Sequence, residues 1–179
     1  ELRLNPDGAP VRRLLVRFLT ATELKAGGAP VAQPEFHVLL ARVRDRLSAL
    51  SALYGEGPLR LDYQGLGERA ARVRLLRAGI RRARVTRRSA ASGQVHPIGG
   101  FLGEAEYAGD LAEFVPLLRA AYWTGVGRQT VWGNGVIQTV IPASGQVLRA
   151  DAGATDGCEF RAPSETPPAT QGAPARRGR

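Results

Sequence analysis

A glycine-rich segment late in the chain, residues 125–135, has the residue types and spacing most typical of a ligand-binding loop. Its two Gly-x-Gly pairs and the arginine between them are Gly125, Gly127, Arg128, Gly133 and Gly135. Glycine permits positive φ angles and lets a ligand approach the backbone without a Cβ in the way. Successive exposed N–H groups in such a loop form a concavity that suits anionic oxygens. The segment therefore predicts a cradle for phosphate groups or a nucleic-acid backbone.

The same segment does not fit the two common nucleotide-binding motifs. A dinucleotide fingerprint has the spacing G-x-G-x-x-G between a strand and the helix that it opens. Here Thr130 occupies the third glycine position, and residues 136–141 are typical of a strand. A P-loop needs Gly-Lys-Ser/Thr, and the only lysine of the chain is Lys25. A glycine-rich connection with a tight turn at each end stays open as the alternative.

Arginine dominates the charge of the chain and is concentrated in one stretch. The formal net charge is +9, with 24 arginines against one lysine. Residues 69–88 contain nine arginines and no acid, whereas beyond residue 150 four arginines balance four acids. Such a field favours polyanions, because counterions released from phosphates drive binding. The charge indicates a nucleic acid as partner, with a solvated basic face as the alternative.

Other features bound the class of protein. A chain of 179 residues suits one domain with extensions. The single cysteine, Cys158, excludes an internal disulfide and favours a reducing, cytoplasmic location. No segment is apolar for long enough to span a membrane, so no membrane partner is expected. The chain begins with Glu1 and contains no methionine, so we expect a fragment or a processed chain.

Hydrophobic periodicity predicts the element order β-α-β-β-α-β. In the two helical segments, apolar residues recur every three or four positions. Strands are expected at 11–19, 80–88, 94–107 and 136–141, and helices at 34–54 and 111–122. Residues 59–78 give no clear signal beyond a short helix at 67–71. The order predicts an α+β, ferredoxin-like (RRM-like) fold, with a four-stranded antiparallel sheet and two helices on one face.

The domain organisation follows from composition. Residues 1–150 are expected to form the ferredoxin-like domain. Residues 151–179 are rich in Pro, Ala, Gly and Arg with few large apolar side chains, and are predicted to be a disordered tail. Small RNA-binding domains commonly use the sheet face that no helix covers.

Several segments resemble a known protein family. Residues 100–118, GFLGEAEYAGDLAEFVPLL, with the glycine-rich segment after them, resemble the C-terminal half of the CRISPR-associated endoribonucleases that process repeat RNA, members of the RAMP superfamily. Residues 18–25, followed by 34–36, are similar to the opening strand and turn of that half, and 87–89 to its basic, serine-bearing strand. The resemblance extends over about residues 11–141.

This resemblance implies an enzyme with two tandem ferredoxin-like domains that cuts repeat RNA without a metal or other cofactor and leaves a 2′,3′-cyclic phosphate. That reaction needs a base for the 2′-OH, an acid for the leaving 5′-oxygen and positive charge for the phosphorane. In the family the catalytic histidine usually lies in the N-terminal domain, which we expect this chain to lack. The resemblance assigns RNA contacts to the four loop glycines, Arg128, Arg87 and Arg88, and the charge of the same strand adds Arg81 and Arg84.

Two histidines and three aromatic residues complete the set of candidates. His37, near the start of the first helix, is a candidate general base, with a solvated helix position as the alternative. His96 is interpreted as incidental, and two histidines without a cysteine cluster make a poor metal site. Tyr107, Trp123 and Trp132 either stack on bases or are buried.

Three functions stay open from the sequence. The first is the RNA-binding C-terminal domain of an endoribonuclease that processes CRISPR repeat RNA into guide RNAs, with other CRISPR effector subunits as further partners. The second is a non-catalytic RAMP scaffold subunit that binds guide RNA. The third is a basic ferredoxin-like interaction module without a role in RNA binding.

Overall fold

The computed structural model describes residues 10–88, 93 and 95–142, and within these it does not describe the side chains of 84–88 and 95–98. In chain order the elements are β1 (Arg13–Thr22), β2 (Lys25–Ala26), β3 (Ala29–Pro30), α1 (Phe36–Tyr54), α2 (Tyr63–Ala71), β4 (Arg74–Arg88), β5 (Val95–Ala108), α3 (Val115–Thr124) and β6 (Ile137–Val140), with 3-10 helices at Ala112–Phe114 and Thr130–Trp132. The tail predicted at 151–179 lies outside the described residues.

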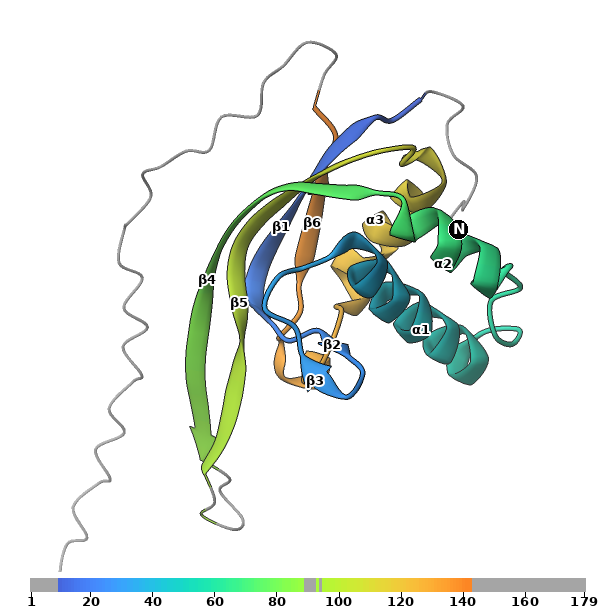
Figure 1. Ribbon diagram of the computed structural model, residues 1–179. Helices are drawn as coiled ribbons and strands as arrows, with labels where there is room; N and C mark the ends of the chain where they lie inside the picture. Colours follow the sequence, from blue (N-terminus) through green and yellow to red (C-terminus); the bar gives the residue numbers. More distant parts are fainter. Residues whose placement is uncertain (1–9, 89–92, 94, 143–179) are drawn as a thin grey trace, which may run out of the picture. The chain divides into compact units, whose positions relative to one another are not determined.

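Four strands form one antiparallel sheet in the order β4-β5-β1-β6, and the helices pack against one of its faces (Figure 1). This arrangement confirms the predicted α+β, ferredoxin-like fold. The face opposite the helices is called the free face below.

The region without a clear sequence signal, residues 59–78, contains α2 and the first part of β4. The side chain of Asp62 caps α2 by accepting a hydrogen bond from the Gly65 N–H at 2.9 Å. β4 begins at Arg74, six positions before the expected start, because it pairs with β5 from Arg74 onward. A bulge between Leu75 and Arg77 interrupts the pairing register and with it the period-2 pattern that would have revealed the strand.

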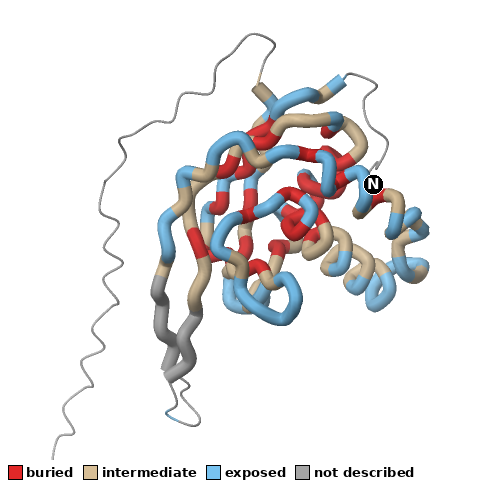
Figure 2. Tube along the Cα trace, in the orientation of Figure 1, coloured by how far each residue is buried: buried red, intermediate tan, exposed pale blue. Residues whose placement is uncertain are grey.

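The core lies between the sheet and the helices (Figure 2). Every second residue of β1 faces it, namely Leu14, Val16 and Phe18. Phe36 of α1 contacts Tyr107 and Phe114 in edge-to-face geometry, with ring centroids 5.1 and 5.2 Å apart. Such aromatic contacts tie α1, β5 and the segment before α3 into one unit.

The β4–β5 hairpin extends past the rest of the sheet (Figure 1). Pairing of β1 with β5 ends at Thr22 and Phe101, whereas β4 and β5 stay paired from Arg84–Gly99 to Arg88–Val95. Residues 84–88 and 95–99, called the hairpin arm below, therefore pair only with each other. An arginine-rich ribbon can in this way reach a partner that does not touch the rest of the sheet.

Replacing Tyr107 with phenylalanine is expected to lower the free energy of unfolding by about 1–2 kcal/mol, because the buried hydroxyl donates a 2.6 Å hydrogen bond to the Pro34 carbonyl, which would lose its partner. Burial, with a contribution from the Glu35 carboxylate, raises the pKa of Tyr107. In the unfolded chain this phenol ionises near pH 10. The stability that protonated Tyr107 contributes below about pH 10 is therefore lost as the pH rises further.

Urea denaturation at pH 7 and at pH 10.5 measures both effects. Tyr54→Phe is the control, because Tyr54 is 84% exposed, and it should leave stability unchanged. Equal stability of Tyr107→Phe and wild type at pH 7 would contradict the role given to the hydroxyl.

Candidate nucleic-acid interface

Backbone hydrogen bonds attach the glycine loop, residues 125–135, to the end of β1. The N–H of Arg128 donates to the Glu23 carbonyl at 3.1 Å, and that of Gly135 donates to the Ala21 carbonyl at 3.0 Å. Next to the loop, the N–H of Val136 donates to Oγ1 of Thr20 at 2.9 Å. The two ends of the loop are joined to each other, since the N–H of Val126 donates to the Gly135 carbonyl at 2.8 Å. The loop is thus a closed turn held against β1.

Its glycines are explained by this close packing. All four have φ between 68° and 83°, a region that other residues rarely adopt. At Gly127 a Cβ would also meet the Glu23 carbonyl oxygen, and at Gly135 it would meet the backbone of Val126. Gly133 differs, because a Cβ there would meet no atom within 4 Å.

The sequence predicted a cradle of N–H groups open to a ligand. Many of these N–H groups instead donate hydrogen bonds to backbone carbonyls of the domain itself. Besides the bonds above, the N–H groups of Gly125, Trp132 and Gly133 donate to backbone carbonyls of Ala121, Gln129 and Thr130. These N–H groups cannot bind a phosphate in the present conformation. The exposed cationic group of the loop is the side chain of Arg128.

The Arg128 guanidinium lies 3.1 Å from the carboxylate of Glu23. The arginine side chain is 54% exposed and that of the glutamate 14%. An ion pair with such an exposed partner contributes little to stability, typically about 0–1 kcal/mol. Arg128 can therefore exchange this carboxylate for a phosphate at small cost, and a phosphate can accept bidentate hydrogen bonds from a guanidinium.

The structure places the arginines of β4 along both faces of the strand. Arg81 is exposed and pairs with Leu102 on the free face. Arg82 pairs with Phe101, a core residue, and so lies on the helix face. Arg84, Arg87 and Arg88 belong to the hairpin arm, where their backbones pair with Gly99, His96 and Val95. Successive residues of a strand point to opposite faces, so Arg81 and Arg82 lie on opposite sides of β4.

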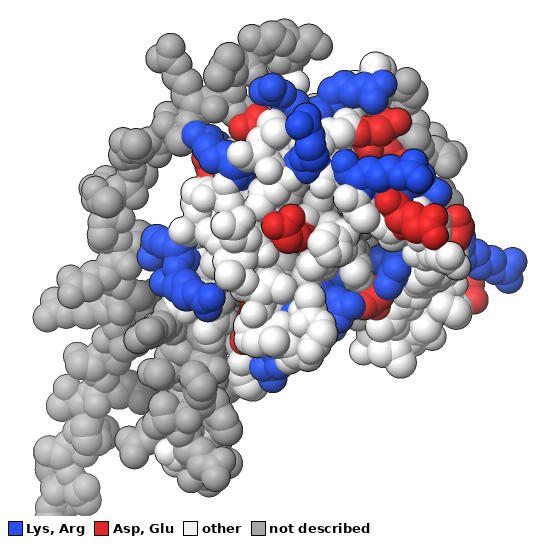
Figure 3. Space-filling model, viewed as in Figure 1, with Lys and Arg blue, Asp and Glu red and all other residues white. Residues whose placement is uncertain are grey.

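Ion pairs cover part of the free face. Glu104 lies between Arg17 and Arg77 at 3.6 and 3.7 Å, and Glu106 lies 3.5 Å from Arg13. The two glutamates are two positions apart on β5 and share this face, and they are largely covered, with side chains 25% and 12% exposed. In the view of Figure 3, basic and acidic side chains are intermixed over much of the described surface. The positive field of these arginines is partly neutralised.

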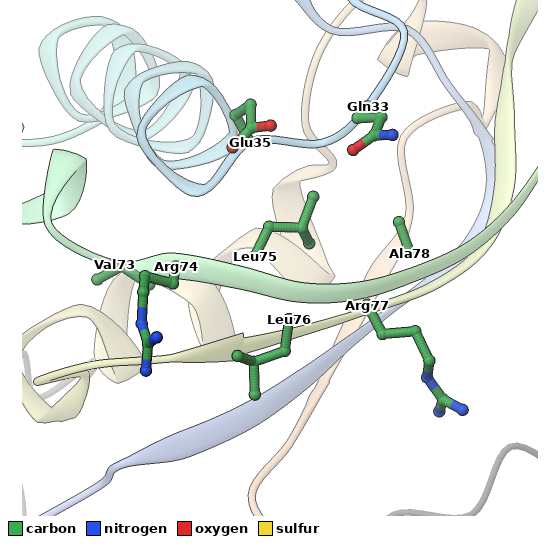
Figure 4. Close-up of a pocket in the computed structure, with 8 residues that line it drawn as sticks. All are labelled: Gln33, Glu35, Val73, Arg74, Leu75, Leu76, Arg77 and Ala78. Atoms are coloured by element: carbon green, nitrogen blue, oxygen red, sulfur yellow. The ribbon is translucent and has the colours of Figure 1, made fainter.

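Two hollows adjoin β4. The larger, of about 560 Å³, lies between β4 and the segment before α1. In Figure 4, Leu75 and Ala78 point toward Gln33 and Glu35, whereas Arg74 and Arg77 extend to the other side of the strand. This groove is thus not a cationic site. A smaller cavity of about 150 Å³ is lined by Glu23 and Arg82, among others, and adjoins the attachment of the glycine loop.

Of the two histidines, only the side chain of His37 is described, and it is not arranged for acid–base catalysis with other described residues. His37 is exposed in the first turn of α1, and no hydrogen bond or ion pair joins its side chain to another described residue. His96 lies in the hairpin arm opposite Arg87. Among the described residues, no group of three or more His, Cys, Asp or Glu side chains could hold a metal ion.

The aromatic candidates divide into two kinds. Tyr107 is fully buried, in agreement with the buried alternative. Trp123 and Trp132 are 81% and 47% exposed, so burial was the wrong interpretation for both. Within the described ranges, no helix has the length and hydrophobicity needed to cross a bilayer.

Comparisons with known proteins agree on one family. The sequence model of the family described as CRISPR-associated endoribonuclease Cas6 matches residues 16–137. A Cas6 structure titled as a product complex is 25% identical, with a TM-score of 0.54, and the match covers 75% of this chain and 53% of that one. No curated protein sequence matches the chain.

Two further structures share the fold at lower identity. Thermus thermophilus Cas6 is 20% identical with a TM-score of 0.57, and the match covers 74% of this chain and 55% of that one. A partial Cas6-RT-Cas1–Cas2 complex is 12% identical with a TM-score of 0.53, covering 81% and 25% of the two chains. The chain thus spans about half the length of the separate Cas6 structures that it matches.

Proposed function

Because the chain belongs to the Cas6 family of CRISPR-associated endoribonucleases, we propose that it is the RNA-binding half of an enzyme that cuts CRISPR repeat RNA into guide RNAs. The observation that carries this proposal is the family match across residues 16–137, which includes the whole glycine loop and all of β4. The related Cas6 structure at 25% identity is a product complex, which supports an enzymatic role.

In this proposal the chain contributes charge and shape to the reaction. Attack of the 2′-OH on the neighbouring phosphate builds negative charge on the phosphorane, which a guanidinium can stabilise. Arg128 is held at the loop surface by its backbone bond to Glu23 and its side chain is exposed. Arg81 and the arginines of the hairpin arm, Arg84, Arg87 and Arg88, bind flanking phosphates and position the strand.

The general base and acid are assigned to the rest of the enzyme. No described side chain orients His37, and a general base must reach the proton that it removes within about 3 Å. We propose that cleavage needs no metal ion. Alone, this chain should therefore bind repeat RNA and cut it little.

The test uses the full 179-residue chain and end-labelled CRISPR repeat RNA from the source genome, in EDTA and in Mg²⁺, over a salt series. Binding that weakens steeply with salt, without cleavage, is expected, since each phosphate contact contributes about −0.7 to the log–log slope on a single strand. Cleavage at one phosphodiester that is lost in His37→Ala would overturn the assignment of the catalytic groups. Absence of binding at low salt would overturn the RNA-binding function.

The same measurement on the protein extended by any further coding sequence distinguishes the scaffold alternative. If the extended protein binds the repeat and cleaves it in EDTA, a non-catalytic scaffold subunit is excluded. If it binds but never cleaves, the scaffold function replaces the enzymatic one.

A further inference from the structure

Two tryptophans, one in the last turn of α3 and one in the glycine loop, are exposed, whereas the phenylalanines of the described core are buried. Trp123, in the last turn of α3, is 81% exposed. Val131 and Trp132, in the 3-10 helix of the glycine loop, are 80% and 47% exposed. By contrast, the four phenylalanines in the described part of the chain are at most 4% exposed: Phe18, Phe36, Phe101 and Phe114.

The exposed side chains lie on two neighbouring segments, the end of α3 and the 3-10 helix of the glycine loop. Trp123 packs edge-to-face on Tyr122, with ring centroids 4.9 Å apart. Two residues later, a Cβ at Gly125 would lie 3.0 Å from Cγ2 of Thr130, so the end of α3 and the start of the 3-10 helix are in contact. The N–H of Trp132 donates to the Gln129 carbonyl at 3.0 Å. The attachment of the loop to β1 therefore also positions the 3-10 helix that carries Val131 and Trp132.

The charge of the segment that carries the rings favours a polyanion over a protein or an apolar partner. Residues 115–135, which contain both tryptophans of the chain, include two arginines, Arg119 and Arg128, and no acidic residue. Aromatic rings beside arginines are typical of surfaces that bind single-stranded nucleic acids, because every base has a face that can stack.

We propose that Trp123, Val131 and Trp132 form a platform on which unpaired bases of single-stranded RNA stack beside the glycine loop. This inference rests on the proposed function and adds to it the part of the RNA that is recognised: unpaired bases, whose phosphates contact Arg128. Bases within a duplex are already stacked and paired, so double-stranded RNA cannot occupy the platform.

The two tryptophans make the platform directly observable, since the chain contains no others. Unlabelled ten-nucleotide oligouridine is titrated into the full chain at low salt while tryptophan fluorescence is recorded. In parallel, the anisotropy of the same oligonucleotide carrying a fluorophore reports binding anywhere on the protein. A ten-base-pair RNA duplex serves as the matched probe without unpaired bases.

Saturable quenching by oligouridine, with little quenching by the duplex, is expected. Trp123→Leu should weaken oligouridine binding about tenfold, the usual effect of losing one stacked ring. Trp123 is the safer site for substitution because it is the more exposed of the two. Tyr54→Leu removes an 84% exposed ring at the end of α1 and should change the affinity little.

The outcomes distinguish failure of the stacking platform from failure of the proposed RNA-binding function. If anisotropy shows salt-dependent binding while tryptophan fluorescence and the Trp123→Leu affinity stay unchanged, the platform is wrong and RNA binding stands. If neither oligouridine nor repeat RNA changes the anisotropy, RNA binding itself is wrong. If fluorescence changes only with protein concentration, as self-association buries the rings, the surface binds another copy of the chain and the platform is wrong.

Discussion

Replacing Gly127 with alanine is expected to detach the glycine loop from β1 and to lower the free energy of unfolding by about 2–4 kcal/mol. A Cβ at this position would collide with the Glu23 carbonyl oxygen, which accepts the N–H of Arg128. The φ angle of 83° adds strain, because side chains other than glycine disfavour this region. The displaced loop would move Arg128 away from Glu23 and reduce the affinity for repeat RNA.

Gly133→Ala is the matched control for this prediction. Its φ of 82° is nearly the same, but a Cβ there meets no atom within 4 Å. It should cost only the backbone strain, about 1 kcal/mol, and leave RNA affinity close to wild type. Urea denaturation and RNA anisotropy on both variants make the comparison. Equal effects at the two positions would mean that the contact with Glu23 does not hold the loop.

Reversing three arginines of β4 is expected to have the largest effect on RNA binding. In Arg81→Glu/Arg84→Glu/Arg87→Glu the slope of log affinity against log salt should become less steep by about 2, because each lost phosphate contact on a single strand removes about 0.7. Arg81 is exposed on the free face, and the other two lie in the hairpin arm. Binding at physiological salt should fall below detection.

A second triple reversal controls for net charge. Arg12, Arg60 and Arg72 are exposed and lie outside β4 and the glycine loop, and reversing all three changes the formal charge by the same amount. This variant should keep most of the salt dependence, since the long-range field is screened over about 10 Å at 0.1 M salt. A comparable loss of slope in both triple variants would show that overall charge, and not β4, governs binding.

Strand and helix positions could be inferred from the sequence because they depend on local patterns. The recurrence of apolar residues along 34–54 and the β-rich run at 11–19 are each complete within one segment. The start of β4 could not be inferred, since the bulge after Leu75 breaks the alternation and only pairing with β5 extends the strand back to Arg74. α2 was expected only as a short helix at 67–71, yet it begins at Tyr63 behind its Asp62 cap.

The sequence identified which residues make up the candidate site, but it did not predict how they are arranged in space. Glycines at 125, 127, 133 and 135 indicated positive φ angles, and all four have them. Which N–H groups remain available depends on Ala21 and Glu23, which lie more than 100 positions earlier in the chain. No local pattern records such a contact, so the occupied cradle was not foreseen. The exposure of Trp123 and Trp132 depends in the same way on what packs around them.

The sequence by itself determined the order of elements, the location of the arginines and the resemblance that led to the family, because each of these follows from the identity and spacing of nearby residues. The tertiary structure alone decided two other features: the attachment of the glycine loop to β1 and the exposure of Trp123 and Trp132. Each of these depends on hydrogen bonds or packing between segments that only the folded chain brings together.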